Sequence, residues 1–249
     1  MTIVEVTILL AAGAVSGMVN AVAGGGTFIS FGALTALGVP PISANATSAI
    51  AQFPGYVTST LAYASDIRRI WRTVIPFVLV SIIGSIVGAF ILLALDNPSF
   101  RALVPWLLIA ATGLFMAGPS ITRSLKARQL SAPAPVAWAI QFIVAIYGGF
   151  FGAGQGIMML ASLGLTEGDD YHRINAIKNG LSIVIAGVAI IVFTSGGVIA
   201  WPEGLAMALA VAVGGWLGVA AAKRVPQAMV RLFVVAVGLT LTAYYALTG

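Results

Sequence analysis

The sequence predicts an all-α polytopic membrane protein with two inverted repeats, each a broken helical hairpin plus three spanning helices. The first supporting observation is composition: the 249 residues are 60% hydrophobic and only 8% charged, whereas soluble domains carry about 25% charged residues. The second is an internal match between the two halves of the chain. The third is the distribution of Lys and Arg, which gather in clusters between long apolar runs. Such clusters indicate membrane topology, so the net charge of +5 does not predict a nucleic-acid partner.

Several classes of function are excluded by what the sequence lacks. Without Cys there is no disulfide, thiolate metal site or cysteine nucleophile, and a single His excludes multi-histidine metal sites. The sequence contains no Walker motif for ATP. All seven acidic residues lie at the ends of apolar runs or between them, so we expect no proton relay or sodium site made of buried carboxylates. We therefore expect no enzyme activity, no catalytic residue, no metal and no cofactor.

Eight apolar runs are close to the roughly 20 residues that a spanning helix needs. In chain order they are Ile3–Val22, Ile42–Ala64, Val74–Leu95, Ala102–Ala117, Pro135–Phe151, Ile174–Phe193, Leu205–Ala222 and Val230–Leu247. Two further runs, Phe28–Leu37 and Ile157–Leu165, are about half as long, and each follows a glycine cluster. The first run has no Lys or Arg before it and contains Glu5, so we expect it to stay in the membrane rather than to be removed as a secretory signal.

The two halves of the chain match without a gap after a shift of 130 positions. Glycine and alanine matches are common in such a composition, but scarce residue types also fall in register. These are Asn45 with Asn175, Trp71 with Trp201, and Arg101 with Arg231. We interpret the match as an internal duplication, with membrane repeat 1 at residues 1–118, a cytoplasmic linker at 119–133 and membrane repeat 2 at 134–249.

The basic clusters predict how the two copies are oriented. They lie at residues 68–72, 123–128 and 223–231, and clusters of this kind face the cytoplasm. If all three do, each repeat contains three full spans. Because three is odd, the second copy is inverted relative to the first.

The segments before those spans, residues 3–37 and 135–165, then make no net crossing and are expected to be hairpins. Both termini are expected outside a bacterial inner (plasma) membrane that the chain crosses several times. One alternative stays open, in which Ile3–Val22 crosses fully and Phe28–Leu37 is a packing segment of the core.

The glycine breaks are candidate anion-binding elements. Irregular backbone at membrane depth is tolerated where it lines a cavity or is buried in protein. The short helices that begin near Thr27 and Ile157 would point N–H groups and the positive ends of their dipoles toward the bilayer centre, and such an end favours an anion. The alternative is close helix packing, which we favour for five other glycines, Gly84, Gly88, Gly214, Gly215 and Gly218.

Polar side chains follow each break on one helical face. Positions 45, 48 and 52 share a face, as do 175, 178, 179 and 182. The candidate substrate-binding residues are therefore Asn20, Gly24, Gly25, Gly26, Thr27, Asn45, Ser48, Gln52, Gly154, Gln155, Gly156, Asn175, Lys178, Asn179 and Ser182. For any single Ser or Thr, a hydrogen bond between helices is an open alternative.

Lys178 stands out because it is a cation inside a predicted apolar run, away from the three basic clusters. A charge at membrane depth is costly unless it is paired or hydrated. Three roles stay open for Lys178: pairing with Asp169 or Asp170, extension of the side chain to the cytoplasmic surface, and neutralisation of a bound anion.

Residues Gly17 to Ser48 (GMVNAVAGGGTFISFGALTALGVPPISANATS) resemble the opening motif of the TauE/SafE family of sulfite exporters. The resemblance extends to Gly148–Leu165 (GGFFGAGQGIMMLASLGL) and covers nearly the whole chain. It implies transport of sulfur-containing anions across the inner membrane and two repeats around a central site. The second copy departs from the first, because Gln155 replaces the middle glycine and Ile177-Lys178 replaces Thr47-Ser48.

The expected function is that of a secondary transporter that exports sulfite, thiosulfate or an organosulfonate by alternating access. A channel or facilitator for a small solute is the alternative, and a membrane scaffold without transport activity or an intramembrane enzyme is a third possibility. The expected partners are the small anion and the lipid bilayer. The sequence leaves the oligomeric state open, with a homodimer as one arrangement.

Overall fold

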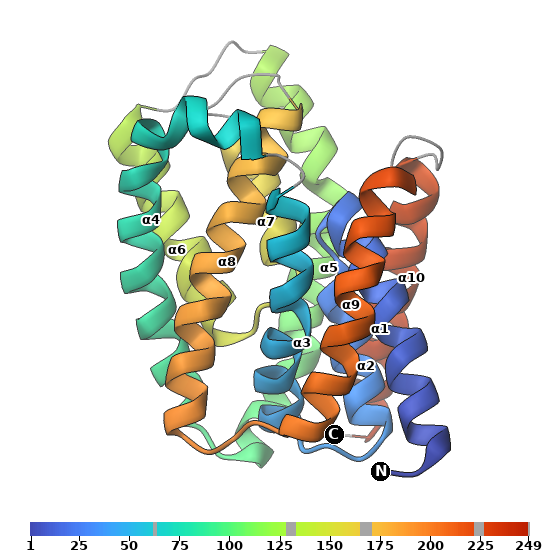
Figure 1. Cartoon of the computed structure of the whole chain (residues 1–249). Helices are drawn as coiled ribbons and strands as arrows, with labels where there is room; N and C mark the ends of the chain where they lie inside the picture. Colours follow the sequence, from blue (N-terminus) through green and yellow to red (C-terminus); the bar gives the residue numbers. More distant parts are fainter. Residues whose placement is uncertain (62–63, 128–132, 165–170, 222–226, 249) are drawn as a thin grey trace.

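The computed structural model describes the whole chain except residues 62–63, 128–132, 165–170, 222–226 and 249. The described residues form ten helices and no strand, and the two termini lie at the same end of the helical bundle (Figure 1). The helices are α1 Ile3–Ala23, α2 Gly26–Ala36, α3 Pro41–Leu61, α4 Ala64–Leu93, α5 Asn97–Ala127, α6 Ala134–Phe150, α7 Gln155–Leu163, α8 Tyr171–Ser195, α9 Trp201–Ala221 and α10 Gln227–Thr248. Each of the ten predicted runs corresponds to one helix.

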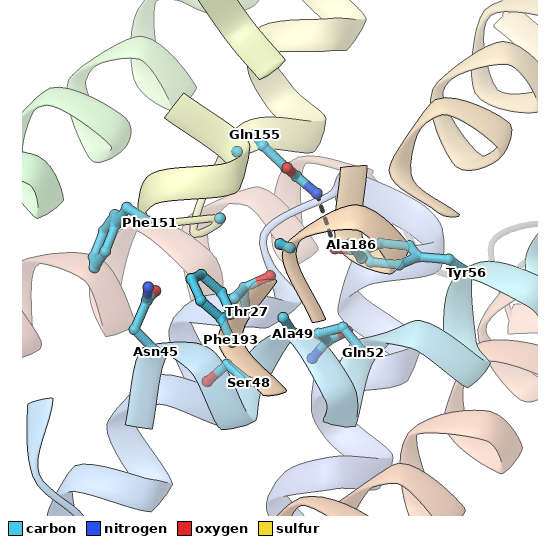
Figure 2. A pocket seen from close by; sticks show the side chains of 13 residues that line it. Thr27, Asn45, Ser48, Ala49, Gln52, Tyr56, Phe151, Gln155, Ala186 and Phe193 are labelled. Carbon is cyan, nitrogen blue, oxygen red and sulfur yellow. Dashed lines mark hydrogen bonds between the residues drawn. The ribbon is translucent and has the colours of Figure 1, made fainter. Parts of the chain in front are cut away.

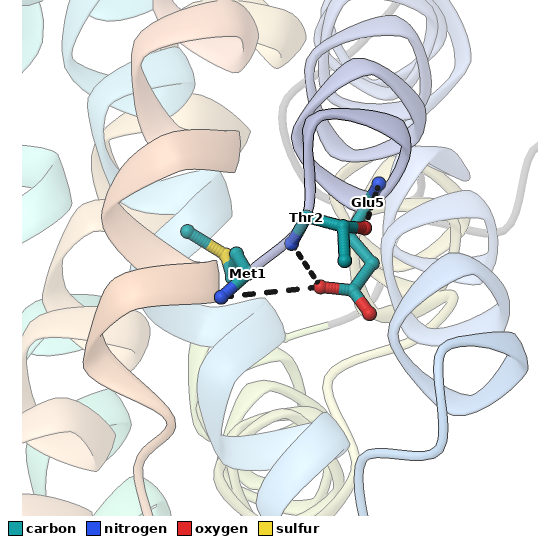
Figure 3. Close-up of polar contacts among 3 residues, drawn as sticks. All are labelled: Met1, Thr2 and Glu5. Atoms are coloured by element: carbon teal, nitrogen blue, oxygen red, sulfur yellow. Dashed lines mark hydrogen bonds and ion pairs between the residues drawn. The ribbon is translucent and has the colours of Figure 1, made fainter.

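Helix α1 begins with a capping box that explains why its apolar sequence contains a carboxylate. The Glu5 backbone N–H donates to Thr2 Oγ1 at 3.2 Å, and the Thr2 N–H donates to Glu5 Oε2 at 2.7 Å (Figure 3). The N-terminal ammonium of Met1 lies 4.0 Å from the same carboxylate oxygen. Glu5 therefore satisfies N–H groups at the helix start, where the helix dipole also favours negative charge.

The other described acidic side chains also lie at helix starts rather than in the core. The Ser99 N–H donates to Asp96 Oδ1 at 3.0 Å just before α5, and hydrogen bonds from Ser99 hold the pKa of the Asp96 carboxyl below its ordinary value. Glu203 lies in the first turn of α9. No acidic side chain is buried among those that the structure describes, as the sequence predicts.

Two helical hairpins interrupt the bundle, as predicted. Helix α1 ends at Gly24, whose φ of +78° is a left-handed conformation that glycine adopts without strain, and α2 turns back toward the termini. Helix α6 is followed by a turn to Gly154, whose φ is +85°, and then by α7. At 11 and 9 residues, α2 and α7 are half-length helices. Figure 1 shows the α1–α2 hairpin opening toward the termini and the α6–α7 hairpin opening toward the opposite end.

Helices from the two halves of the chain pack closely against one another at glycines. A Cβ atom on Gly88 of α4 would lie 2.0 Å from the Ile146 carbonyl oxygen of α6. A Cβ on Gly214 of α9 would lie 2.1 Å from the Ala14 carbonyl oxygen of α1. On the same helices, added Cβ atoms on Gly84 and Gly218 would lie 2.7 Å from the Phe142 carbonyl oxygen and 2.8 Å from the Met18 carbonyl oxygen. The packing interpretation of these four glycines is confirmed, and each hairpin packs against a helix from the other half of the chain.

Helices α4 and α5 are longer than the apolar runs that predicted them. Residues 64–73, expected to include a basic loop around Trp71, continue the helix of α4. Residues 119–127 of the predicted linker likewise belong to α5, whereas 128–132 lie outside the described residues. The basic-loop prediction was wrong because hydropathy marks the part of a helix that suits lipid, and Arg and Lys are themselves good helix formers.

Three described helical segments are long and apolar enough to cross a membrane: Ile3–Ala21, Val74–Leu93 and Arg173–Ser195. Helix α3 is as long as α1, but the polar side chains along one of its faces lower its hydropathy. Large apolar side chains are exposed on the outside of the bundle, including Ile83 of α4, Trp106 of α5 and Leu209 of α9. Such an apolar exterior is what lipid requires. The length of α1 alone does not exclude a full crossing, but α2 returns the chain to the end where α1 began (Figure 1).

Candidate functional site

The two hairpin breaks meet inside the bundle. An added Cβ on Gly24 would lie 3.1 Å from the Gly156 carbonyl carbon, and one on Gly156 would lie 3.1 Å from the Gly24 Cα atom. Both residues are buried. Segments 130 positions apart in the sequence thus bring the ends of α1 and α6 and the starts of α2 and α7 to one place.

A small cavity of about 20 Å³ lies beside this meeting point (Figure 2). One part of its lining is polar and uncharged: Thr27, Asn45, Ser48, Gln52, Tyr56 and Gln155. The remainder consists of Ala49, Gly148, Phe151, Gly152, Ala186, Ala189 and Phe193. The volume is enough for about one water molecule.

Helix α3 supplies most of the polar lining from one face. Asn45, Ser48, Gln52 and Tyr56 are spaced three or four residues apart, so they follow one another along the helix. The Asn45 side-chain amide donates to the Phe150 carbonyl oxygen at 2.8 Å and so satisfies a carbonyl at the end of α6. The Gln52 amide donates to the hydroxyls of Ser16 and Ser30 in the α1–α2 hairpin. The face of α3 that lines the cavity therefore also forms hydrogen bonds to both hairpins.

Tyr56 connects the two hairpins through its hydroxyl. Gln155 Nε2 of α7 donates to it at 3.4 Å, as Figure 2 shows. Thr27 of α2 and Asn20 of α1 also lie close to this hydroxyl. Sequence reasoning missed Tyr56, although the spacing of 45, 48 and 52 continues to 56. The aromatic ring looks apolar in a hydropathy pattern, and only the fold shows that its hydroxyl is buried among polar groups.

The cavity contains five of the predicted site residues, Thr27, Asn45, Ser48, Gln52 and Gln155. The other ten lie outside its lining. The glycines among them have packing roles: Gly25 lies against Val234, Gly26 against the Ser16 carbonyl group, and Gly154 against Ala111. The glycines predicted as backbone donors are thus not part of this cavity, although Gly152 of the second glycine cluster does line it. The phenylalanine and alanine wall was also missed, because such residues are common throughout the sequence.

The remaining predicted residues form a second polar group along α8 and at the end of α1: Asn20, Asn175, Lys178, Asn179 and Ser182. All are at most 5% exposed. Lys178 is 1% exposed, and its Nζ atom donates to the Asn20 carbonyl oxygen at 3.4 Å. A lysine that extends to the surface keeps its ammonium in water, so this burial contradicts that role. The predicted partners Asp169 and Asp170 lie outside the described residues.

Each polar group donates a hydrogen bond to a backbone carbonyl of one hairpin, and the two carbonyls lie at matching positions in the two halves of the chain. Asn45 of α3 donates to Phe150 near the second break, and Lys178 of α8 donates to Asn20 near the first. Phe150 and Asn20 are themselves 130 positions apart. The two accepting carbonyls therefore correspond to each other, whereas the donors do not, because Asn45 matches Asn175 and Lys178 matches Ser48.

Replacing Asn45 with leucine is expected to destabilise the fold, because it leaves the carbonyl of the partly buried Phe150 without its side-chain donor. An unpaired buried group of this kind costs about 1–3 kcal/mol. The free energy of unfolding of the purified protein in detergent measures the effect. Ser48→Ala is the matched control, since Ser48 Oγ donates to Ala44 within its own helix, and a change below about 0.5 kcal/mol is expected there. Equal losses in the two variants would contradict the tie between α3 and α6.

Broken helices that meet beside a buried polar cavity are typical of membrane transporters, and the fold and the cavity place the chain in that class. The model of the family described as "Sulfite exporter TauE/SafE" matches residues 9–245, so the chain belongs to this family. Its resemblance to that family is confirmed.

Relatives from three bacteria have names of the same kind. The chain is 27% identical to a "Probable membrane transporter protein" of Haemophilus influenzae over 95% of this chain and 92% of the relative. It is 26% identical to "Probable membrane transporter protein ORF9" of Sinorhizobium sp, covering 84% and 80%. It is 23% identical to "Probable membrane transporter protein YfcA" of Escherichia coli, covering 92% and 84%. The chain is thus similar to probable transporters over most of their length.

Proposed function

We propose that this protein is a secondary transporter that exports a small sulfur-containing anion, such as sulfite, thiosulfate or an organosulfonate, across the bacterial inner membrane. The family description and the names of the relatives support transport. In this proposal, two inverted repeats at residues 1–118 and 134–249 alternate in opening the central cavity to either side. The two hairpins enter the bundle from opposite ends (Figure 1), which supports that arrangement.

The observation that carries the proposal is a cavity of uncharged donors with a buried cation nearby. Hydroxyl and amide groups can donate to the oxygens of an oxyanion, and Thr27, Ser48 and Tyr56 present hydroxyls there. The Gln52 amide contacts two serine hydroxyls, which can donate as well as accept. Rotation of that amide would turn its N–H groups into the cavity and let its oxygen accept from Ser30, while Ser16 keeps donating to the Gly26 carbonyl oxygen.

Lys178 supplies the charge that such a site needs. It is the one fully buried charged side chain among the described residues, and a buried cation is costly unless something offsets it. The Asn20 carbonyl at the negative end of α1 offsets part of the charge. A bound anion would offset the rest, so binding and charge compensation support each other.

The proposed direction follows from the basic residues. The start of α4, the end of α5 and the start of α10, which contain most of the clustered Lys and Arg, lie at the end opposite to the termini (Figure 1). The positive-inside rule makes that end cytoplasmic and puts both termini outside. A cytoplasm-negative potential then favours export by about 2.3 kcal/mol per charge per 100 mV, so an exporter of anions needs no proton relay.

The size of the cavity favours a carrier over a channel. A space for about one water molecule is smaller than any of the proposed anions. Side chains must therefore move to admit the ligand, as a carrier with an occluded state requires. A channel or facilitator for a small solute is the alternative, and it would need a wider conduit.

Flux measurements test the proposal. Purified protein in proteoliposomes is expected to transport labelled sulfite, thiosulfate or a short alkylsulfonate with saturation, counterflow and a dependence on membrane potential. Acetate and protein-free vesicles are the controls. Flux that rises linearly with concentration and shows no counterflow would favour the channel, and no flux of any sulfur anion would overturn the proposal.

A further inference from the structure

We call the contact between helices α3 and α8 the α3–α8 seam. Its polar side chains come from α3 near one end of the bundle and from α8 near the other. The two helices pack side by side and run in opposite directions (Figure 1). Near the end with the termini, α3 contributes Asn45, Ser48 and Gln52, and α8 contributes only Ala186, Ala189 and Phe193. Toward the opposite end, α8 is polar instead, with Lys178, Asn179 and Ser182 on the same face. The seam thus has an uncharged half and a charged half.

The charged half has the properties of a binding site. Asn179 and Ser182 are at most 1% exposed, and Asn179 Nδ2 and Ser182 Oγ have no hydrogen-bond partner among the described residues. Buried polar atoms are normally satisfied, and these two are donors beside a buried ammonium group. The Asn179 amide, the Ser182 hydroxyl and the Lys178 ammonium group together offer three donors and one positive charge, which suit an oxyanion.

Tyr56 lies between the two halves. Its hydroxyl contacts Gln155 and Thr27, which line the cavity, and also Asn20, whose carbonyl group receives the Lys178 hydrogen bond. A ligand that moves along the seam must therefore pass this hydroxyl. Because these neighbours belong to α1, α2 and α7, the contacts of the hydroxyl depend on the relative position of both hairpins.

We propose that the α3–α8 seam holds two anion half-sites in series, separated by the Tyr56 hydroxyl. The charged half-site, formed by Asn175, Lys178, Asn179 and Ser182, takes the anion first from the end with the basic residues. The uncharged half-site, which is the cavity in Figure 2, takes it next and releases it to the other side. Passage requires the hydrogen bond between Tyr56 and Gln155 to open. This inference rests on the proposed transport function.

Single cysteines test the two half-sites, since the natural sequence contains no Cys. Ser182→Cys and Ser48→Cys are reconstituted in vesicles of known orientation and treated from either side with an anionic, membrane-impermeant methanethiosulfonate. We expect Ser182→Cys to react at least tenfold faster from the end with the basic residues, and Ser48→Cys at least tenfold faster from the end with the termini. Adding Tyr56→Phe is expected to reduce both ratios to below threefold.

Two controls keep the result specific. Ser81→Cys, at a buried serine bonded to Gln141 outside the seam, is expected to react from neither side. Tyr245→Phe, at a buried tyrosine outside the cavity, is expected to leave both ratios unchanged. Reaction of Ser48→Cys and Ser182→Cys at equal rates from each side, or no effect of Tyr56→Phe, would overturn the separation into half-sites.

The charge of the first half-site is tested with the same variants. The anionic reagent is expected to modify Ser182→Cys at least tenfold faster than a cationic one, and Lys178→Gln is expected to abolish that preference. The preference at Ser48→Cys is expected to change less than threefold. An unchanged preference at Ser182→Cys would overturn the assignment of Lys178 to the half-site. Because labelling needs no transported anion, absent flux would instead contradict the proposed function itself.

Discussion

Replacement of Lys178 by methionine is expected to lower anion flux by at least about a hundredfold without destabilising the fold. Loss of the buried cation leaves the anion with uncharged donors alone, and about 3 kcal/mol of lost ligand affinity corresponds to roughly a hundredfold. Stability should hold, because replacing a buried charge with an apolar side chain of similar size is often neutral or stabilising. The Asn20 carbonyl also keeps its hydrogen bond from the Gly24 N–H, at 3.1 Å. Initial rates in proteoliposomes and melting temperatures in detergent measure the two effects.

Two further variants separate charge from packing at this position. Lys178→Arg keeps the positive charge and is expected to retain flux within about tenfold of the natural protein. Arg101→Met removes a cation at an exposed position on α5 and is expected to leave flux unchanged. A lowered melting temperature together with full flux in Lys178→Met would mean that Lys178 serves the end of α1 rather than the anion.

Replacement of Gly26 by alanine is expected to destabilise the fold strongly. The added Cβ would lie 2.1 Å from the Ser16 carbonyl oxygen and 2.6 Å from the Asn20 Cβ atom. Backbone atoms cannot give way as a flexible side chain can, so α2 must move away from α1. That movement also breaks the contacts that Ser16 makes with Ser30 and Gln52. We expect a loss near the upper end of the about 1–3 kcal/mol that overpacking costs, with loss of transport.

Gly113→Ala is the matched control, because the position is helical and an added Cβ would meet no atom within 4 Å. Alanine favours the helix over glycine by up to about 1 kcal/mol, so this variant is expected to be as stable as the natural protein or slightly more so. Melting temperature and monodispersity in detergent provide the comparison. Equal melting temperatures for Gly26→Ala and Gly113→Ala would contradict the close approach of α1 and α2.

The cavity shows how far residue type and spacing can predict a site. Asn45, Ser48 and Gln52 could be placed on one helical face from their spacing alone, and Gln155 stood out because it replaces a glycine in the second copy. Tyr56, Phe151 and Phe193 could not be identified in this way. Aromatic residues are equally suited to lipid and core, and hydropathy does not distinguish these environments. The sequence also placed both polar groups in one site, whereas the structure puts only the α3 group, with Thr27 and Gln155, in the cavity.

The sequence by itself determined the ten helices, the two half-length helices and the cationic residue in α8. These features depend on local properties, namely apolar length, glycine positions and the rarity of charge at membrane depth. Only the tertiary structure decided that Gly24 lies against Gly156, that Tyr56 joins both hairpins, and that each hairpin packs on a helix from the other half of the chain. Such contacts join residues that lie in different helices, and they depend on which faces fit together, a property of shape that no local pattern of residues encodes.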